Sequence, residues 1–296
     1  MAVRAAVTKA LGSPVVDVVD QSGGFSPGLA ARVRGESGRR VFVKAVGLAL
    51  NPYSPGLHRR EIEIAWKLPT RVAAPRLLSS YDDGDWVALV FEDVDGRMPA
   101  LPWREDEWRR VHAAMVELAA MLTPSPLPVT GIGTRMGDEF SGWRRLAGAP
   151  HLATDLDPWA RANLDRLAEA ESHWEAAAAG KALVHGDVRA DNILLTDKRV
   201  MFVDWPHAAL AQPWVDLLLM LPSVVMRGGP PAEEVWRTSP ITIGADTDAV
   251  DSVLAAVTGF FVYSALLPTP VNLPRLRGFQ RAQGAHALTW LRNRLR

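Results

Sequence analysis

Three polar side chains, each beside a short run of apolar residues, constrain this chain more than any other feature. Asp187 follows one apolar run, Asn192 precedes a second, and Asp204 ends a third at residues 200–203. This arrangement is typical of strands that lead into loops. Asp187 and Asn192 are five positions apart, and Asp204 lies twelve positions after Asn192. Each polar side chain is therefore predicted to lie where a strand end leads into a loop.

The residue types indicate a metal–nucleotide site with a proton acceptor beside it. Asp187, Asn192 and Asp204 supply oxygen ligands, and Mg²⁺ takes one or two carboxylates together with substrate phosphates. The competing interpretation is that the three are unrelated turn-forming residues. One such residue would fit that interpretation, but three at this spacing, each flanked by an apolar run, favour a shared site.

The pattern H-G-D-x-x-x-x-N at residues 185–192, with Asp204 downstream, resembles the aminoglycoside phosphotransferase and choline kinase family, small-molecule relatives of protein kinases. Protein kinases carry H-R-D-x-x-x-x-N followed by D-F-G. This chain has Gly186 where protein kinases have Arg, as small-molecule kinases do, and D-W-P at residues 204–206 in place of D-F-G. The resemblance extends over most of the chain.

The resemblance implies an α+β fold of the bilobal protein-kinase type, with a small antiparallel sheet in the N-lobe and a larger, mostly helical C-lobe. Residues 1–94 would bind the nucleotide, and residues 95–296 would carry the catalytic loop, the metal site and the acceptor-substrate site. Periodicity predicts strands at 15–19, 29–33, 41–46, 75–78 and 86–91, and helices at 2–11, 57–68, 103–122, 157–179, 213–219, 247–266 and 278–294.

Lys44 ends the apolar run at residues 41–43, and by itself it would be a solvated lysine at a strand end. Its position after a glycine turn and two strands resembles the kinase lysine that contacts the α- and β-phosphates. The expected partner is a Glu on the next helix, where Glu61 and Glu63 both qualify. The family pattern favours Glu61, and Glu63 is expected on the solvated face.

Gly24, Phe25 and Ser26 lie in a glycine-rich stretch between two predicted strands. Such a turn lets backbone N–H groups approach phosphates, and the similar loop of the family covers the nucleotide phosphates, although this one departs from G-x-G-x-x-G. The stretch also matches G-x-S-x-G, the nucleophile elbow of α/β-hydrolases. There the residue after the serine donates its N–H, and here that residue is Pro27, which has none. The hydrolase interpretation is therefore disfavoured.

Glu92 and Val94 follow the predicted strand at 86–91, in an acidic stretch where a kinase hinge would cross between lobes. In the family, the adenine contacts come from the hinge backbone. The same acidic stretch fits a solvated turn equally well. Because backbone groups contact the base, the sequence does not choose between ATP and GTP.

The resemblance assigns roles to the central residues. Asp187 would accept or orient the proton of a substrate hydroxyl, and Asn192 and Asp204 would hold Mg²⁺ against the nucleotide phosphates. Phosphoryl transfer needs mainly positioning and charge neutralisation. The resemblance adds Lys44, which would pair with the α- and β-phosphates, to these three residues.

Three neighbours of this set have separate expectations. Arg189 lies where protein kinases carry a lysine that faces the γ-phosphate, and Arg can hold phosphate oxygens through a bidentate fork; a solvent-facing Arg is the alternative. His185 is expected to be a buried structural residue. The resemblance implies that Asp216 supports the catalytic loop from below.

Composition excludes several function classes. Lys plus Arg and Asp plus Glu both number 33, so a balanced charge gives no reason to expect nucleic acid. The absence of cysteine excludes disulfides and a cysteine nucleophile and is typical of a cytoplasmic protein. The N-terminus makes a poor signal peptide, and the longest apolar run is too short to span a bilayer. We therefore predict a cytoplasmic enzyme without a membrane partner.

The acceptor is predicted to be a hydroxylated small molecule. Aminoglycosides are polycations, so their site should be rich in carboxylates, whereas the last 26 residues contain six Arg and no Asp or Glu. An antibiotic sugar, a choline-, homoserine- or sugar-like metabolite, and a non-catalytic nucleotide-binding role all remain open. The sequence indicates no oligomeric state.

Overall fold

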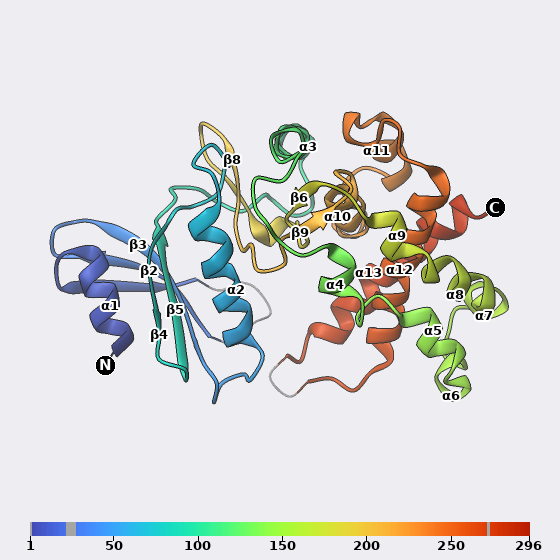
Figure 1. Cartoon of the computed structure of the whole chain (residues 1–296), viewed down its shortest axis with the longest axis horizontal. Coiled ribbons are helices and arrows are strands. Elements are labelled where there is room, and N and C mark those ends of the chain that lie inside the picture. The colour runs from blue at the N-terminus through green and yellow to red at the C-terminus, as the bar shows by residue number, and fades with distance from the viewer. Residues whose placement is uncertain (1, 22–27, 271–272) are drawn as a thin grey trace. The chain divides into compact units, whose positions relative to one another are not determined.

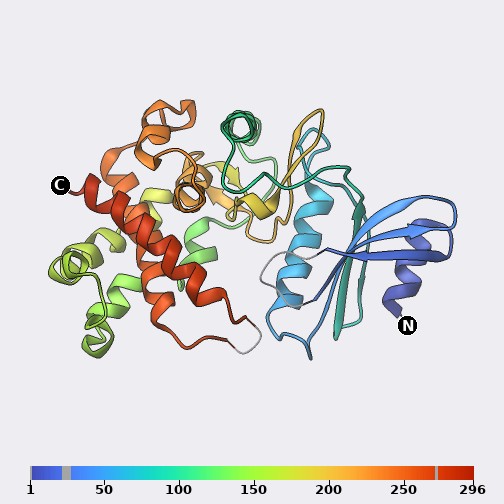
Figure 2. The same ribbon diagram turned by 180° about the vertical axis from the view of Figure 1, so that it is seen from behind.

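The computed structural model describes residues 2–21, 28–270 and 273–296. They form two compact units, each built from two chain segments (Figures 1 and 2). The first unit contains Met1–Pro99 and Ala190–His207, and the second contains Ala100–Arg189 and Ala208–Arg296. An antiparallel sheet near the N-terminus and a helical C-terminal part confirm the predicted α+β fold class.

The first unit is organised around a five-stranded antiparallel sheet in the order β1-β2-β3-β5-β4. Its strands are β1 (Val15–Asp20), β2 (Leu29–Gly35), β3 (Arg40–Gly47), β4 (Leu77–Asp82) and β5 (Trp86–Glu92). The turn between β2 and β3 contains Gly38 at φ 81°, a left-handed conformation that glycine adopts without steric cost. The strands of both hairpins, β2–β3 and β4–β5, lie where the sequence predicts strands on either side of the turns at residues 35–38 and 82–85.

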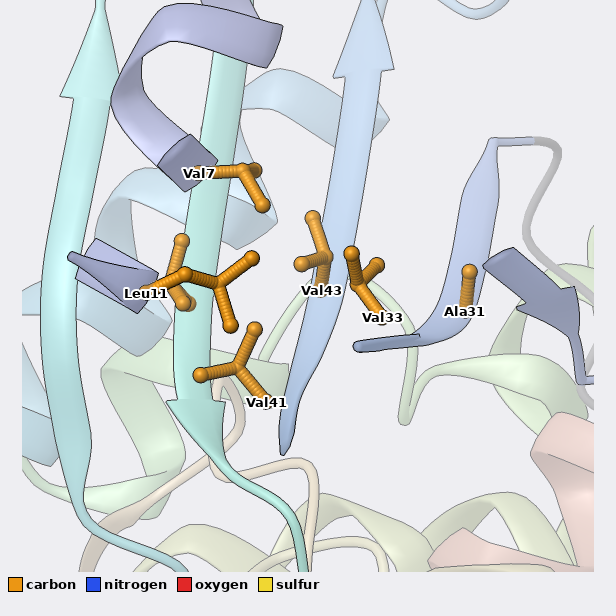
Figure 3. Close-up of a cluster of buried hydrophobic side chains, with 7 residues drawn as sticks. Val7, Leu11, Ala31, Val33, Val41 and Val43 are labelled. Atoms are coloured by element: carbon orange, nitrogen blue, oxygen red, sulfur yellow. The ribbon is translucent and has the colours of Figure 1, made fainter. Parts of the chain in front are cut away.

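Each face of this sheet packs against its own helix. Val41 and Val43 of β3 join a buried cluster with Val7 and Leu11 of α1 (Ala2–Leu11), which Figure 3 shows in close-up. On the opposite face, a second cluster brings together side chains of β5 and of α2 (Ser54–Lys67), with Phe42 packed against it. Because side chains alternate along a strand, Lys44 falls on the α2 face together with Phe42.

Residues 190–207 pack with the N-terminal sheet rather than with the helical unit. They form a 3-10 turn, η1 (Ala190–Asn192), and the antiparallel pair β7 (Ile193–Leu195) and β8 (Val200–Phe202). The N–H of Val203 donates to the carbonyl of Asn192 over 3.0 Å. This bond places Asn192 and Asp204 at the same end of the ribbon. The sequence resemblance assigns nucleotide binding to residues 1–94 and the catalytic loop, metal site and acceptor site to residues 95–296. That assignment of functions to the two parts stays a prediction.

The second unit is mostly helical. Its helices are α3 (Glu105–Met121), α4 (Ile132–Met136), α5 (Gly142–Ala147), α6 (Pro150–Ala153), α7 (Pro158–Ala162), α8 (Leu164–Ser172), α9 (Trp174–Ala178), α10 (Val215–Met226), α11 (Ala232–Thr238), η2 (Pro240–Thr242), α12 (Thr247–Leu266) and α13 (Leu276–Arg294). β6 (Ala182–Val184) pairs with β9 (Ala209–Ala211).

Helix α12 forms the centre of this unit, where it contacts α5, α8, α9 and α13. Figure 2 shows α13 running alongside it. Among the described residues, α12 is the one helix long and apolar enough to cross a membrane by length and composition. Its residues from Val253 to Gly259 are all buried within the unit. The apolar character of α12 therefore has an explanation in packing.

The predicted helix at 157–179 is instead three short helices, α7, α8 and α9. Asp157 caps the first as predicted, since its side chain accepts from the N–H groups of Trp159 and Ala160. The chain leaves helical geometry at Asn163, where φ is −116° and the side-chain amide donates to the carbonyl of Trp159. That local competition is typical of Asn, and it does not disturb the apolar periodicity on which the prediction depended.

Candidate active site

Lys44, Glu61 and Asp204 form a connected ion-pair network within the first unit. The ammonium of Lys44 lies 2.6 Å from Glu61 Oε2 and 2.7 Å from Asp204 Oδ1. Lys44 comes from β3, Glu61 from α2, and Asp204 from the segment after β8. Glu63 is exposed on α2. Of the two competing acids, the structure therefore pairs Glu61 with Lys44.

Burial and charge act against each other in this network. Burial acts to lower the pKa of Lys44, but the carboxylates of Glu61 and Asp204 outweigh it and raise that pKa well above its ordinary value. Burial raises the pKa of Glu61, against the opposing charge of Lys44 and the N–H of Trp205. Lys44 therefore stays protonated at neutral pH, which leaves a fixed positive charge in the site.

Asp204 has an unusual backbone. Its φ of 68° makes it the one non-glycine residue with positive φ among the described residues. A left-handed conformation of this kind costs on the order of 1 kcal/mol and persists where surrounding contacts hold it. Its carboxylate side chain is 41% exposed, whereas the side chain of Asn192 is buried. The exposed carboxylate can take a ligand other than Lys44.

These side chains line one pocket, all of whose lining residues belong to the first unit. Lys44, Asn192 and Asp204 are among its polar groups, and Phe42 and Phe91 are among its apolar walls. The predicted hinge residues Glu92 and Val94 line the same pocket. The predicted loop residues Gly24, Phe25 and Ser26 lie outside the described residues. A flat apolar wall beside a charged end suits a ligand with an aromatic base and an anionic tail.

Arg32 is a pocket residue that the sequence analysis missed. Its guanidinium pairs with the buried carboxylate of Asp93 at 3.2 Å and donates to the carbonyls of Val94 (3.1 Å) and Gly96 (3.3 Å). These contacts fix the chain that follows β5. Arg32 is a polar residue between apolar ones in β2, and that interruption was the only signal in the sequence.

The side-chain oxygens of Asn192 and Asp204 fit a hard divalent cation that is bound by the protein and by phosphates together. In the described part of the chain, no group of three or more His, Cys, Asp or Glu residues could hold a metal ion. Asn192 and Asp204 instead offer one amide oxygen and one carboxylate, and Mg²⁺ commonly takes one or two carboxylates and completes its shell with phosphates and water. Lys44 already places a cation at the Asp204 carboxylate.

The loop around Asp187 lies in the second unit and is held from within it. The N–H groups of His185 and Gly186 donate to the two carboxylate oxygens of Asp216 over 2.7 and 2.8 Å. His185 is fully buried, as predicted. Gly186 has φ 80°, which explains a glycine where protein kinases carry Arg. Burial raises the pKa of Asp216, against the lowering effects of His185 and the two N–H groups.

Asp187 and Arg189 lie side by side in this loop. Arg189 Nη1 is 3.8 Å from Asp187 Oδ1, and the Arg189 guanidinium lies over the ring of Phe279 at 5.4 Å from its centroid. The Asp187 side chain is 34% exposed and that of Arg189 is 20% exposed. The carboxylate is thus accessible, and the arginine is oriented by a carboxylate and an aromatic ring rather than loose in solvent.

His58, one turn before Glu61 on α2, supports a prediction about acid stability. Burial, followed by the charge of Lys44, lowers its pKa from 6.5 to about 4. The folded state therefore favours the neutral imidazole, so this contribution to stability is present above pH 6.5 and is lost as the pH falls toward 4. Between about pH 7.5 and about pH 4.5, the free energy of unfolding should fall by about 2 kcal/mol more than in His58→Gln.

Urea unfolding of the unmutated chain and of His58→Gln across this pH range checks the prediction. His151→Gln, at an exposed position, is the matched control and should follow the unmutated chain. Equal pH dependence of His58→Gln and the unmutated chain would show that the imidazole does not carry the effect.

The family model described as the phosphotransferase enzyme family matches residues 28–246. No curated protein matches the sequence significantly. Three of the most similar solved structures are all below 25% identity, so they establish the fold alone.

The first is a thermostable mutant of the aminoglycoside phosphotransferase APH(4)-Ia in complex with AMP-PNP and hygromycin B, with 15% identity, a TM-score of 0.66, and 99% of this chain and 98% of that chain covered. The second is the aminoglycoside phosphotransferase APH(3'')-Id from Streptomyces rimosus with ADP and streptomycin, with 21% identity, a TM-score of 0.52, and 80% and 94% covered. The third is the choline kinase LicA from Streptococcus pneumoniae, with 14% identity, a TM-score of 0.59, and 97% and 98% covered.

The family match includes Lys44, Glu61, Asp187, Asn192 and Asp204, and it extends over well more than half of the sequence. The fold of the solved structures agrees with it. The chain belongs to the phosphotransferase enzyme family.

Proposed function

We propose that this phosphotransferase is a cytoplasmic small-molecule kinase. It transfers the γ-phosphate of ATP or GTP, with Mg²⁺, to a hydroxyl group of an antibiotic or sugar-like acceptor. The observation that carries the proposal is the pocket in which Lys44 contacts both Glu61 and Asp204, with Asn192 beside them. Modification of an antibiotic hydroxyl in this way would give the host resistance.

The pocket residues divide the work of binding the nucleotide. Lys44, oriented by Glu61, holds the α- and β-phosphates, and the backbone around Glu92 and Val94 contacts the base. Asn192 and Asp204 hold Mg²⁺, which when bound neutralises charge on the phosphates. The fixed positive charge of Lys44 and the apolar walls of the pocket support this assignment.

Asp187 and Arg189 act on the transferred group. Asp187 accepts or orients the proton of the acceptor hydroxyl, and its partly exposed carboxylate supports that role. Arg189 holds oxygens of the γ-phosphate through its guanidinium fork. Its contact with Phe279 restrains the guanidinium, which lowers the entropy lost when it binds phosphate. Asp216 keeps the loop in shape from beneath.

The charged residues near the C-terminal helices favour an acceptor that is not a polycation. Two acids near the C-terminal helices have structural partners: Asp246 caps α12 through the N–H of Ala249, and Asp251 pairs with Arg294 at 2.5 Å. The last 26 residues contain six Arg and no acid. A strongly cationic aminoglycoside would lack the carboxylates it needs in this part of the chain. A neutral or weakly charged hydroxyl compound suits it better.

A mass-spectrometric screen tests the proposal. A panel of neutral hydroxylated antibiotics, sugar-like alcohols, choline, homoserine and polycationic aminoglycosides would be incubated with the chain, Mg²⁺ and ATP or GTP. We expect nucleotide-dependent mass gain of one phosphate on a hydroxyl of a neutral or weakly charged antibiotic or antibiotic sugar. Gain on a choline-, homoserine- or sugar-like alcohol would identify a metabolite kinase instead.

Phosphorylation of aminoglycosides alone would contradict the charge argument. A chain that binds nucleotide but modifies no acceptor and hydrolyses no nucleotide would be a non-catalytic relative. The presence of Lys44, Asp187, Asn192 and Asp204 argues against that outcome.

A further inference from the structure

The segment at residues 202–206 is held at every residue by a contact inside the first unit. The contacts come from α2, from β3 and from neighbouring backbone. They are Phe202 N–H to Ala73 O (2.7 Å), Val203 N–H to Asn192 O (3.0 Å), Lys44 to Asp204 (2.7 Å), Trp205 N–H to Glu61, and Arg60 Nε to Pro206 O (2.8 Å). Asp204 at the centre of the segment is the residue with φ 68°.

Two of these contacts hold the chain on the far side of Asp204, and both come from α2. Glu61 accepts the N–H of Trp205, and Arg60 donates to the carbonyl of Pro206. Pro206 is buried and, as a proline, has no backbone N–H. Its carbonyl is therefore its only hydrogen-bonding group, and Arg60 satisfies it. A buried carbonyl without this partner would favour a rearranged backbone.

We propose that Arg60 is a positioning residue for the Asp204 carboxylate and sets the affinity of the site for its divalent cation. The inference rests on the proposed function, since it takes Asp204 as a ligand of Mg²⁺. Arg60 holds Pro206, which keeps the backbone at Asp204 left-handed and its carboxylate directed at the pocket. Arg60 is not among the residues that line the pocket, so it acts through the segment and not through the ligand.

Helix geometry supplies a matched control at the preceding residue. Successive residues on a helix point about 100° apart, so Arg59 faces another part of the unit. Its guanidinium holds Asp82 at 2.8 and 2.9 Å and donates to the carbonyl of Gly84 over 2.8 Å. Arg59 and Arg60 thus have the same chemistry and neighbouring positions, but only Arg60 contacts the segment that carries Asp204.

The test measures nucleotide binding rather than turnover. A fluorescent ADP analogue would be titrated into the unmutated chain and into Arg60→Met, Arg60→Lys and Arg59→Met, first without metal and then at increasing Mg²⁺. We expect Arg60→Met to raise the Mg²⁺ concentration for half-maximal tightening by about tenfold, which one charge-assisted hydrogen bond can account for. Metal-free affinity should stay unchanged, Arg60→Lys should recover part of the effect, and Arg59→Met should match the unmutated chain.

Two results would overturn the inference. One is an unchanged Mg²⁺ dependence of nucleotide binding in Arg60→Met. The other is a loss of nucleotide affinity in Arg60→Met that is as large without metal as with Mg²⁺, which would make Arg60 a merely structural residue. Thermal unfolding of each variant without ligand separates global destabilisation from the local effect. If the unmutated chain bound no nucleotide at all, the proposed function would fail, and the assignment of Arg60 would fail with it.

Discussion

Replacing Asp187 with alanine should lower the rate of phosphate transfer by roughly 10²- to 10⁴-fold, which is the usual contribution of a positioned acid–base group. The acceptor hydroxyl would then have no carboxylate to take or orient its proton. Nucleotide affinity should be unchanged, because Asp187 is not among the residues that line the pocket of the first unit. Steady-state kinetics with the acceptor found by the screen, together with nucleotide titration, check both parts.

The fold should tolerate this change, because the Asp187 side chain is 34% exposed and the loop is held through Asp216. Asp197→Ala, in the exposed turn between β7 and β8, is the matched control and should keep full turnover. Retained turnover in Asp187→Ala would remove Asp187 from the mechanism. Lost nucleotide binding in that variant would show that its role is not confined to the acceptor.

Replacing Lys44 with methionine should have the largest effect on the first unit. It removes the cation between two carboxylates, one of them the fully enclosed Glu61, whose side chain is 3% exposed. Removing one partner of a buried ion pair costs about 3–5 kcal/mol, because the other charge is left without compensation. Nucleotide affinity should also fall sharply, because the phosphates lose their fixed positive charge.

The loss should depend on pH in a defined direction. Burial already raises the pKa of Glu61, and Lys44 opposes that shift. Without Lys44 the folded pKa rises further above the unfolded value of 4.5. Protonated Glu61 is then compatible with the fold, so stability is retained below pH 4.5 and lost as the pH rises through the raised pKa. With Lys44 present the folded pKa of Glu61 is about 7, so Glu61 is protonated in both folded proteins at acid pH, and the deficit of Lys44→Met should grow as the pH rises through about 7.

Urea unfolding of Lys44→Met at several pH values measures this deficit. The double variant Lys44→Met with Glu61→Gln should regain part of the stability, because no buried charge remains. Lys67→Met, at the exposed end of α2, should leave stability and nucleotide affinity unchanged. A deficit that is constant across the pH range would contradict the assignment of the effect to Glu61.

The parts of the site that follow local rules were predictable from the sequence. Alternation along β3 places Phe42 and Lys44 on one face, and the periodicity of α2 buries Glu61 while it exposes Glu63. The apolar runs beside Asn192 and Asp204 became β7 and β8, whose pairing brings those two residues to one end. Each of these inferences uses a spacing of a few residues.

The contacts that escaped prediction join residues far apart in the chain or depend on backbone geometry. Arg60 reaches a carbonyl 146 positions away, and Arg32 reaches carbonyls more than 60 positions away. A side chain that donates to a distant backbone oxygen leaves no complementary residue type for the sequence to reveal. The left-handed backbone of Asp204 is likewise uncommon for Asp and became visible only with the fold. The sequence therefore indicated the residues of the site, but not the distant contacts and the backbone conformation that hold them in place.

The proposed nucleotide site can be tested by a crystal structure of the chain with a non-hydrolysable ATP analogue and Mg²⁺. The proposed site places the cation at about 2.1 Å from oxygens of Asn192 and Asp204, with the ammonium of Lys44 on the α- and β-phosphates. A nucleotide bound elsewhere, or a cation held by neither residue, would contradict it.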